Sequence, residues 1–167
     1  MIYERMLRYW ACILMMMSMM AACTNTTKII HSTDDAELHF KQGITYAARA
    51  DYDNAILEFQ KSINIRSTAK AYSNMGVCYM KTGKVNKALE ALQTAVRIDN
   101  CDSFAQYNLA AVYSVMDKTD LGIDALDKAL QCGFSNYDAI RFDKDLDNLR
   151  GEPEFRTTLE KHKVFLQ

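Results

Sequence analysis

The sequence predicts an all-α protein in which three consecutive helix pairs are followed by a shorter helical segment. Anchor residues return at a nearly constant interval, because Gly43 is followed 33 residues later by Gly76, and Ala55 by Ala88 at the same distance. A third copy continues with Ala110, 34 residues after Gly76. An interval of this size indicates stacked units of supersecondary structure. The chain also contains a single Pro and few β-branched runs, which favours helices over strands.

Turn and capping residues place the individual helices. The dipeptides Ala50-Asp51, Gly83-Lys84 and Asp117-Lys118 are of types that suit helix ends. Asp34, with Glu37 three residues later, forms a capping box that begins the first helix. We therefore expect helix pairs at 35–48 with 53–66, at 69–82 with 85–98, and at 103–116 with 119–132.

The residues shared by the copies resemble a known repeat. In the central copy they are Met75-Gly76 and Tyr79, followed by Ala88, Leu92 and Ala95. The other copies hold Gln42-Gly43, Tyr46, Ala55 and Phe59, and then Leu109-Ala110, Tyr113, Gly122 and Leu126. This layout resembles the tetratricopeptide repeat, whose period is about 34 residues. The resemblance implies a right-handed α-solenoid over 35–134, with repeats at about 36–68, 69–102 and 103–134, and a role in protein–protein interaction.

The copies depart from the family pattern at three kinds of position. The positions of the family's Trp hold His39, Tyr72 and Gln106, and those of its closing Pro hold Ser67, Asn100 and Phe134. Gly122 replaces an Ala inside a helix, which costs about 1 kcal/mol. We expect these departures to weaken single repeats without disturbing the period.

Residues 135–167 fall outside the period and are expected to form C-terminal capping helices. Ser135-Asn136 could cap a short helix that ends near Arg141, Gly151 would end another, and Pro153 would open the next, where its missing N–H does no harm. Residues 145–155 also resemble a tail found after the last repeat in many such proteins. Its apolar residues would cover the third pair, as solenoids require for solubility: Leu146, Leu149, Phe155 and Leu159.

Residues 1–22 have the layout of a secretory signal peptide. Arg5 and Arg8 precede an apolar run over 9–22, which is too short to span a bilayer because that requires about 20 helical residues. The run ends in Met20-Ala21-Ala22-Cys23, which resembles the lipobox of bacterial lipoproteins. The resemblance implies cleavage before Cys23 and acylation of its thiol and amine, for example with palmitate. The alternative is an ordinary signal peptide with an incidental Cys at its end.

An acylated Cys23 would place the protein on a membrane of the cell envelope. Acyl chains contribute about 0.8 kcal/mol per buried CH2, so two or three chains anchor a domain stably. The polar residues 23–34 would then act as a tether. Thr24 is not an Asp, so by analogy with the family nothing specifies retention at the inner membrane. We expect the outer membrane where the cell has one.

Charge and motif content argue against several classes of function. The 167 residues suffice for one domain with a sizeable core. The formal net charge of −1 offers no basic field for nucleic acid. The three histidines show no metal-binding or catalytic spacing, and the acidic alternation at 143–147 lacks the Gly and Glu of a calcium loop. We therefore expect no cofactor, no metal and no enzymatic activity.

By the geometry of the family, the first helix of each pair lines the inner face of the solenoid. We expect an apolar partner-binding groove formed by Phe40, Ile44, Val77, Met80, Phe104, Tyr107 and Ala111. Such a groove suits a helix or an extended peptide. Repeats that clamp a peptide's C-terminal carboxylate use Lys, Arg and Asn there, and the aromatic and aliphatic ends of this groove offer no basic residue. The alternative is that several of these side chains are core residues or are covered by the C-terminal tail.

Two hypotheses of function follow. In the first, the protein is a lipid-anchored scaffold that holds a protein or peptide partner in the envelope and performs no chemistry. In the second, it is an accessory that binds a diffusible peptide or glycan fragment. The second hypothesis predicts that the ligand alone raises the thermal stability of the purified domain.

The five cysteines divide into groups with different expected fates. Cys12 leaves with the signal peptide and Cys23 is modified. Cys78 is expected to be a small buried hydrophobic residue. Cys101 and Cys132, near the ends of successive second helices, could pair in an oxidising envelope, but the sequence favours two separate thiols.

Overall fold

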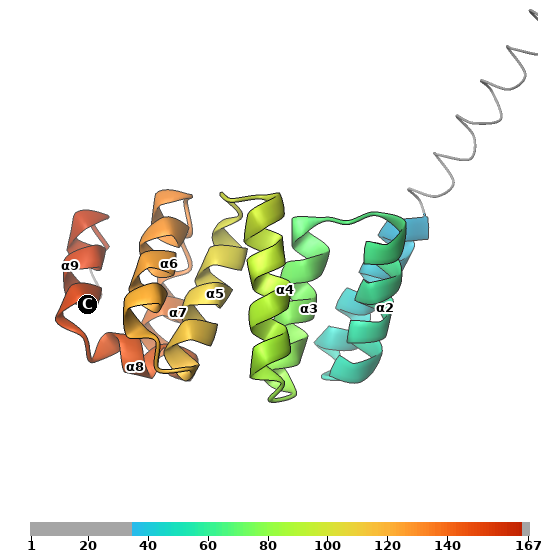
Figure 1. Ribbon diagram of the computed structural model, residues 1–167, viewed down its shortest axis with the longest axis horizontal. Helices are drawn as coiled ribbons and strands as arrows, with labels where there is room; N and C mark the ends of the chain where they lie inside the picture. Colours follow the sequence, from blue (N-terminus) through green and yellow to red (C-terminus); the bar gives the residue numbers. More distant parts are fainter. Residues whose placement is uncertain (1–34, 165–167) are drawn as a thin grey trace, which may run out of the picture.

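The structure of the protein is a computed structural model that describes residues 35–164. Every regular element in this range is a helix (Figure 1). The first helix, α1, covers residues 35–48. It is followed by α2 (Tyr52–Ile65), α3 (Ala69–Lys81), α4 (Val85–Ile98), α5 (Ser103–Val115), α6 (Thr119–Gln131), α7 (Tyr137–Phe142), the 3-10 helix η1 (Lys144–Leu146), α8 (Asp147–Arg150) and α9 (Pro153–Lys161).

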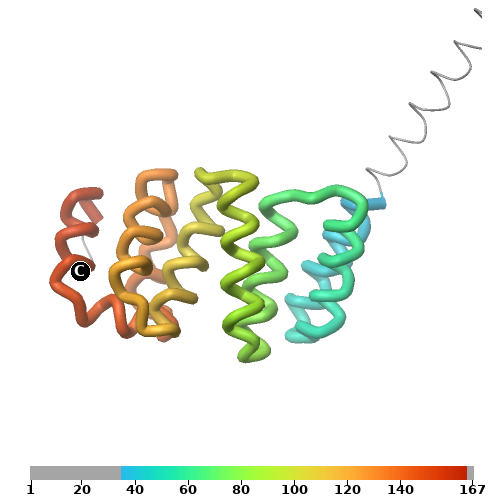
Figure 2. The backbone as a smooth tube through the Cα atoms, in the orientation of Figure 1, coloured from blue at the N-terminus to red at the C-terminus, as the bar shows by residue number. Residues whose placement is uncertain are grey.

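The helices stand side by side in chain order along the long axis of the molecule (Figure 1). The turns within pairs lie at one edge, and the connections between pairs lie at the other (Figure 2). The six helices of the three pairs lie within one residue of the expected ranges at each end. The predicted all-α solenoid of three helix pairs with C-terminal helices is therefore confirmed.

A small residue allows the two helices of the second pair to cross closely. A Cβ atom added to Gly76 in α3 would lie only 2.7 Å from Cγ of Leu92 in α4. Leu92 is fully buried, so this contact belongs to the centre of the core. The repeated Gly thus sets the distance between the helices, and the large residue opposite it fills the space.

The turn within each pair uses a left-handed residue at one repeated position. Ala50, Gly83 and Asp117 have φ values of 59°, 72° and 56°. Gly adopts this conformation without strain, whereas Ala and Asp do so at a cost of about 1–2 kcal/mol. The backbone geometry of the turn is therefore kept in all three pairs, although only one of them carries the residue that favours it.

The outer face of the first pair is polar where the later pairs are apolar. Met75 and Leu109, which occupy the same register in α3 and α5, are buried in the hydrophobic core, whereas the equivalent residue in α1 is the exposed Gln42. Similarly, the buried Ala91 of α4 corresponds to Glu58 of α2, which bonds to the ring of His39. A polar outer face is what terminal repeats of solenoids require.

The C-terminal helices complete the core at the opposite end. Their apolar residues Leu146, Leu149, Phe155 and Leu159 are all buried, as predicted. A Cβ added to Gly122 of α6 would lie 2.6 Å from Cδ2 of Leu149. Gly122 is therefore the residue that lets α8 approach α6, and its cost in helix propensity accompanies this contact.

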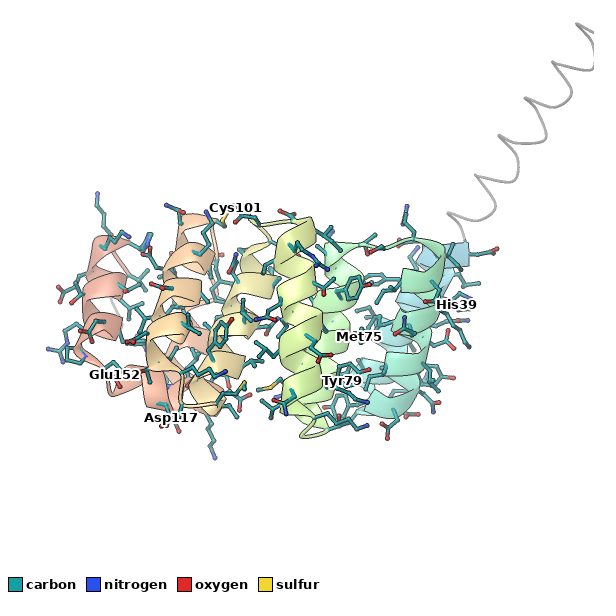
Figure 3. The ribbon with its side chains drawn as sticks, in the orientation of Figure 1. His39, Met75, Tyr79, Cys101, Asp117 and Glu152 are labelled. Carbon is teal, nitrogen blue, oxygen red and sulfur yellow. A yellow bond between two sulfur atoms is a disulfide. The ribbon has the colours of Figure 1, made fainter. Side chains whose placement is uncertain are left out.

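A disulfide joins Cys101, in the turn before α5, to Cys132 at the C-terminal end of α6. Cys101 lies at the edge where successive pairs are connected (Figure 3). The preference for separate thiols was wrong, because sequence spacing does not reveal that the end of α6 returns to the start of α5. Cys78 is a buried free cysteine, as expected.

Candidate functional site

The open part of the predicted groove lies on the first two helix pairs. Ile44 of α1 is 40% exposed, and Val77 and Met80 of α3 are half-buried. Ile44 and Val77 occupy the same register, 33 residues apart. We call the surface around Phe40, Ile44, Val77 and Met80 the α1–α3 face.

Phe40 contributes to both the surface and the core. Its ring centroid lies 5.7 Å from that of Phe59 at a tilted angle, and it packs against the core cluster of the first two pairs. Phe59 is fully buried. A change at Phe40 would therefore disturb the fold as well as the face, so Ile44 and Val77 are the better positions for testing binding.

The third pair does not continue this open face. Tyr107 is 6% exposed and Ala111 is 5% exposed, so neither can line an open groove, contrary to the expectation. The cause is the chain itself, because η1 and α8 pack against α5. In the third pair, the alternative that the C-terminal tail covers these residues is the correct one.

Three polar contacts hold this segment against α5. The hydroxyl of Tyr107 donates a hydrogen bond of 2.8 Å to Oδ2 of Asp143. Arg150 donates to the backbone carbonyl of Asp143, and Nδ2 of Asn148 donates to the backbone carbonyl of Ser114 at 2.8 Å. The hydroxyl oxygen of Ser114 is itself buried without a hydrogen-bond partner in the part of the chain that the structure describes.

Phe104 is the outermost ring of a short aromatic stack. It is 63% exposed and meets Phe134 edge to face at 5.4 Å. Phe134 in turn stacks on Tyr107 with ring centroids 4.3 Å apart. Phe104 is thus an exposed apolar residue on a rigid support, at the start of α5.

The titratable groups near this surface are not poised for catalysis. Burial raises the pKa of Tyr107, and its hydrogen bond to Asp143 raises it further. Burial also raises the pKa of the Cys78 thiol to about 11, which keeps it protonated and unreactive. Within residues 35–164, no three His, Cys, Asp or Glu side chains gather as a metal site would require.

Sequence reasoning missed two lysines on the same side of α3. Lys70 and Lys81 are exposed, and with Asn74 and Val77 they follow the helical spacing of four, three and four residues. That spacing was the available signal, since it places all four residues along one stripe of the helix.

The predictions at the N-terminus concern residues that the structure does not describe. They are the signal peptide at 1–22, the tether at 23–34 and the acylation of Cys23. Among the helices that are described, none has the length and apolar character needed to cross a bilayer.

Comparison with known proteins identifies the repeat. Residues 69–100 match the family model described as "Tetratricopeptide repeat". A chloroplastic protein of Arabidopsis thaliana is 33% identical over 89 residues, which cover 52% of this chain and 27% of that protein. Sperm-associated antigen 1 of Mus musculus is 28% identical over 111 residues, covering 64% of this chain and 12% of that protein. This chain therefore spans only about a quarter and about an eighth of these relatives.

Solved structures support the same fold. The MamA protein aligns with a TM-score of 0.63 and 26% identity, covering 77% of this chain and 74% of that chain. The first tetratricopeptide-repeat domain of Spaghetti (RPAP3), bound to the HSP90 peptide SRMEEVD, aligns with a TM-score of 0.60 and 16% identity, covering 78% of this chain and 92% of that chain. The protein is a tetratricopeptide-repeat protein with the solenoid fold of such domains.

Proposed function

We propose that the protein is a non-enzymatic scaffold that holds a protein or peptide partner on the α1–α3 face, extended by Phe104. One observation carries this proposal. Ile44 and Val77 are open, whereas Ala111 in the equivalent register is covered by the protein's own C-terminal segment. The third pair thus already binds a polypeptide at this position, and the first two pairs have the same surface without a covering segment.

The solved neighbours support a peptide as the bound class. The Spaghetti (RPAP3) domain carries a peptide in its structure. Tetratricopeptide-repeat domains combine main-chain rigidity with side-chain variety, so the fold suits recognition of extended or helical segments. Ile44 and Phe104 would provide the apolar anchors for such a segment.

We further propose that the scaffold is anchored in the cell envelope through acylated Cys23, with residues 23–34 as its tether. The lipobox-like sequence motivates the proposal, and the disulfide between Cys101 and Cys132 is consistent with it. Disulfides persist in oxidising compartments and are rare in reducing ones.

A crosslinked pull-down from intact cells tests the binding proposal. The test variant is Ile44→Glu combined with Val77→Glu. The matched control is Leu57→Glu, because Leu57 is 58% exposed and its register holds Glu90 and Asp124 in the later pairs. We expect a partner that is recovered with wild type and control but lost with the test variant. Equal recovery by all three proteins would exclude this face as the binding site.

Metabolic labelling with a palmitate analogue tests the anchor separately. Wild type should incorporate the label and Cys23→Ser should not. Trp10 is the single Trp of the chain, so cleavage before Cys23 leaves a product without indole fluorescence. Persistent Trp emission from membrane-extracted protein would contradict cleavage.

A further inference from the structure

A stripe of four residues on α3 combines charge with an apolar centre. Lys70, Asn74, Val77 and Lys81 lie on one side of the helix, and both lysines are exposed. Eleven residues separate the lysines, which at about 1.5 Å per residue corresponds to about 16 Å along the axis. Val77 lies between them, with Ile44 in the same register of α1.

The two lysines have no ionic partner within residues 35–164. Lys70 lines a hollow together with Asp99 and Asp102, but these carboxylates are already engaged. Asp99 accepts a hydrogen bond from the backbone N–H of Cys101, and Asp102 accepts from two backbone N–H groups at the start of α5. Both positive charges therefore remain available to a ligand.

Lys70 is not explained by the stability of its own helix. It lies in the first turn of α3, where the helix dipole disfavours a positive charge. Lys81 lies in the last turn, where a positive charge is favoured. A lysine retained at the unfavourable end is more readily understood as a binding residue.

The neighbouring helix α1 adds no free negative charge to this stripe's surroundings. Its exposed Glu37 contacts Lys41 at 3.7 Å and Arg66 at 3.6 Å, so its charge is compensated within the protein. The α1–α3 face is therefore apolar in the middle and positive at both ends of α3.

We propose that the α1–α3 face binds an acidic internal peptide segment in extended conformation. The segment carries two carboxylates four residues apart and an apolar side chain midway between them. This inference rests on the proposed function and specifies its partner. In an extended chain, residues i, i+2 and i+4 point to the same side and span about 13 Å. The flexible stems of Lys70 and Lys81 cover the remaining distance of about 3 Å.

The spacing of the lysines favours side-chain carboxylates over a chain terminus. Two positive charges about 16 Å apart cannot both contact the last residue of a peptide, whose two carboxylates belong to one residue. An end-blocked peptide should therefore bind, since it retains the side-chain carboxylates and lacks the terminal one.

The test uses the full chain in detergent and a fluorescently labelled, end-blocked peptide of sequence Ser-Glu-Thr-Leu-Thr-Glu-Ser. Binding is measured by fluorescence anisotropy at low salt. Lys70→Gln combined with Lys81→Gln should weaken binding by about tenfold, equivalent to about 1.4 kcal/mol. The matched control is Lys118→Gln combined with Lys163→Gln, which removes the same charge from exposed positions elsewhere. The control should bind like wild type.

Two further comparisons decide between outcomes. Replacing both Glu residues of the peptide by Gln should weaken binding to wild type by a similar factor, and added salt should weaken only the interactions that depend on charge. Absence of binding by the Glu peptide, or equal binding of the Glu and Gln peptides, would overturn the acidic motif. The pull-down with Ile44→Glu and Val77→Glu remains an independent test, so the scaffold proposal can survive that result.

Discussion

Substitution of Gly122 by Ala tests whether the C-terminal helices are fitted to α6. In an exposed helix interior, Ala is favoured over Gly by about 1 kcal/mol. Here the new Cβ would lie 2.6 Å and 3.1 Å from the two Cδ atoms of Leu149, whereas carbon atoms in contact are normally about 3.5–4.0 Å apart. Leu149 is fully buried and has little room to move. Overpacking of this kind costs about 1–3 kcal/mol, so we expect a net destabilisation of about 0–2 kcal/mol.

A double-mutant cycle separates the contact from helix propensity. Leu149→Ala alone should cost about 2–5 kcal/mol, because it leaves a cavity. In that background the steric conflict is gone, and Gly122→Ala should now stabilise the protein by about 1 kcal/mol. The free energy of unfolding is measured by urea denaturation with circular dichroism, provided that the slope is the same for all variants. A stabilising effect of Gly122→Ala in the wild-type background would refute the reasoning.

Three further predictions concern the same half of the molecule. Replacing Cys101 and Cys132 by Ala should lower the free energy of unfolding by about 3–4 kcal/mol, since the bridge closes a loop of 31 residues; an unchanged melting temperature would contradict this. Ser114→Ala should be neutral or stabilising by about 1 kcal/mol in urea denaturation, because it removes a buried hydroxyl without a partner; a clear loss of stability would contradict it. Burial alone would raise the pKa of Asp127, but hydrogen bonds from Lys and His side chains at the end of α9 outweigh it and lower that pKa. The resulting stability is present above the unfolded-state pKa of about 4 and is lost as the pH falls through the lower folded-state pKa, so Asp127→Asn should flatten the acid limb of a melting-temperature profile; an unaltered acid limb would contradict this.

Local sequence features predicted most of the fold. The period, the turn residues and the capping residues are all short-range signals, and they placed the helices within one residue. Pro153 and Gly151 were also sufficient to locate the break between α8 and α9. These signals succeed because each helix pair is stabilised mainly by contacts within itself and with its neighbours.

The site was predicted only in part, because its boundary depends on contacts between distant segments. Tyr107 and Ala111 have the register of groove residues, but the chain returns 36 residues later and covers them. The pairing of Cys101 with Cys132 depends in the same way on where α6 ends relative to α5. The charged stripe from Lys70 to Lys81 could have been found from spacing alone. What the sequence could not supply was the knowledge that its charges have no partner within residues 35–164.

Site-specific photo-crosslinking in intact cells tests the central proposal most directly. A photoreactive amino acid is placed singly at Ile44 or Phe104, and at Leu57 or Leu121, which are similarly exposed on α2 and α6. If the scaffold binds its partner as proposed, positions 44 and 104 crosslink to the same envelope protein and positions 57 and 121 do not. Crosslinking to that protein from 57 and 121, with none from 44 and 104, would place the binding surface on the opposite helices and contradict the account.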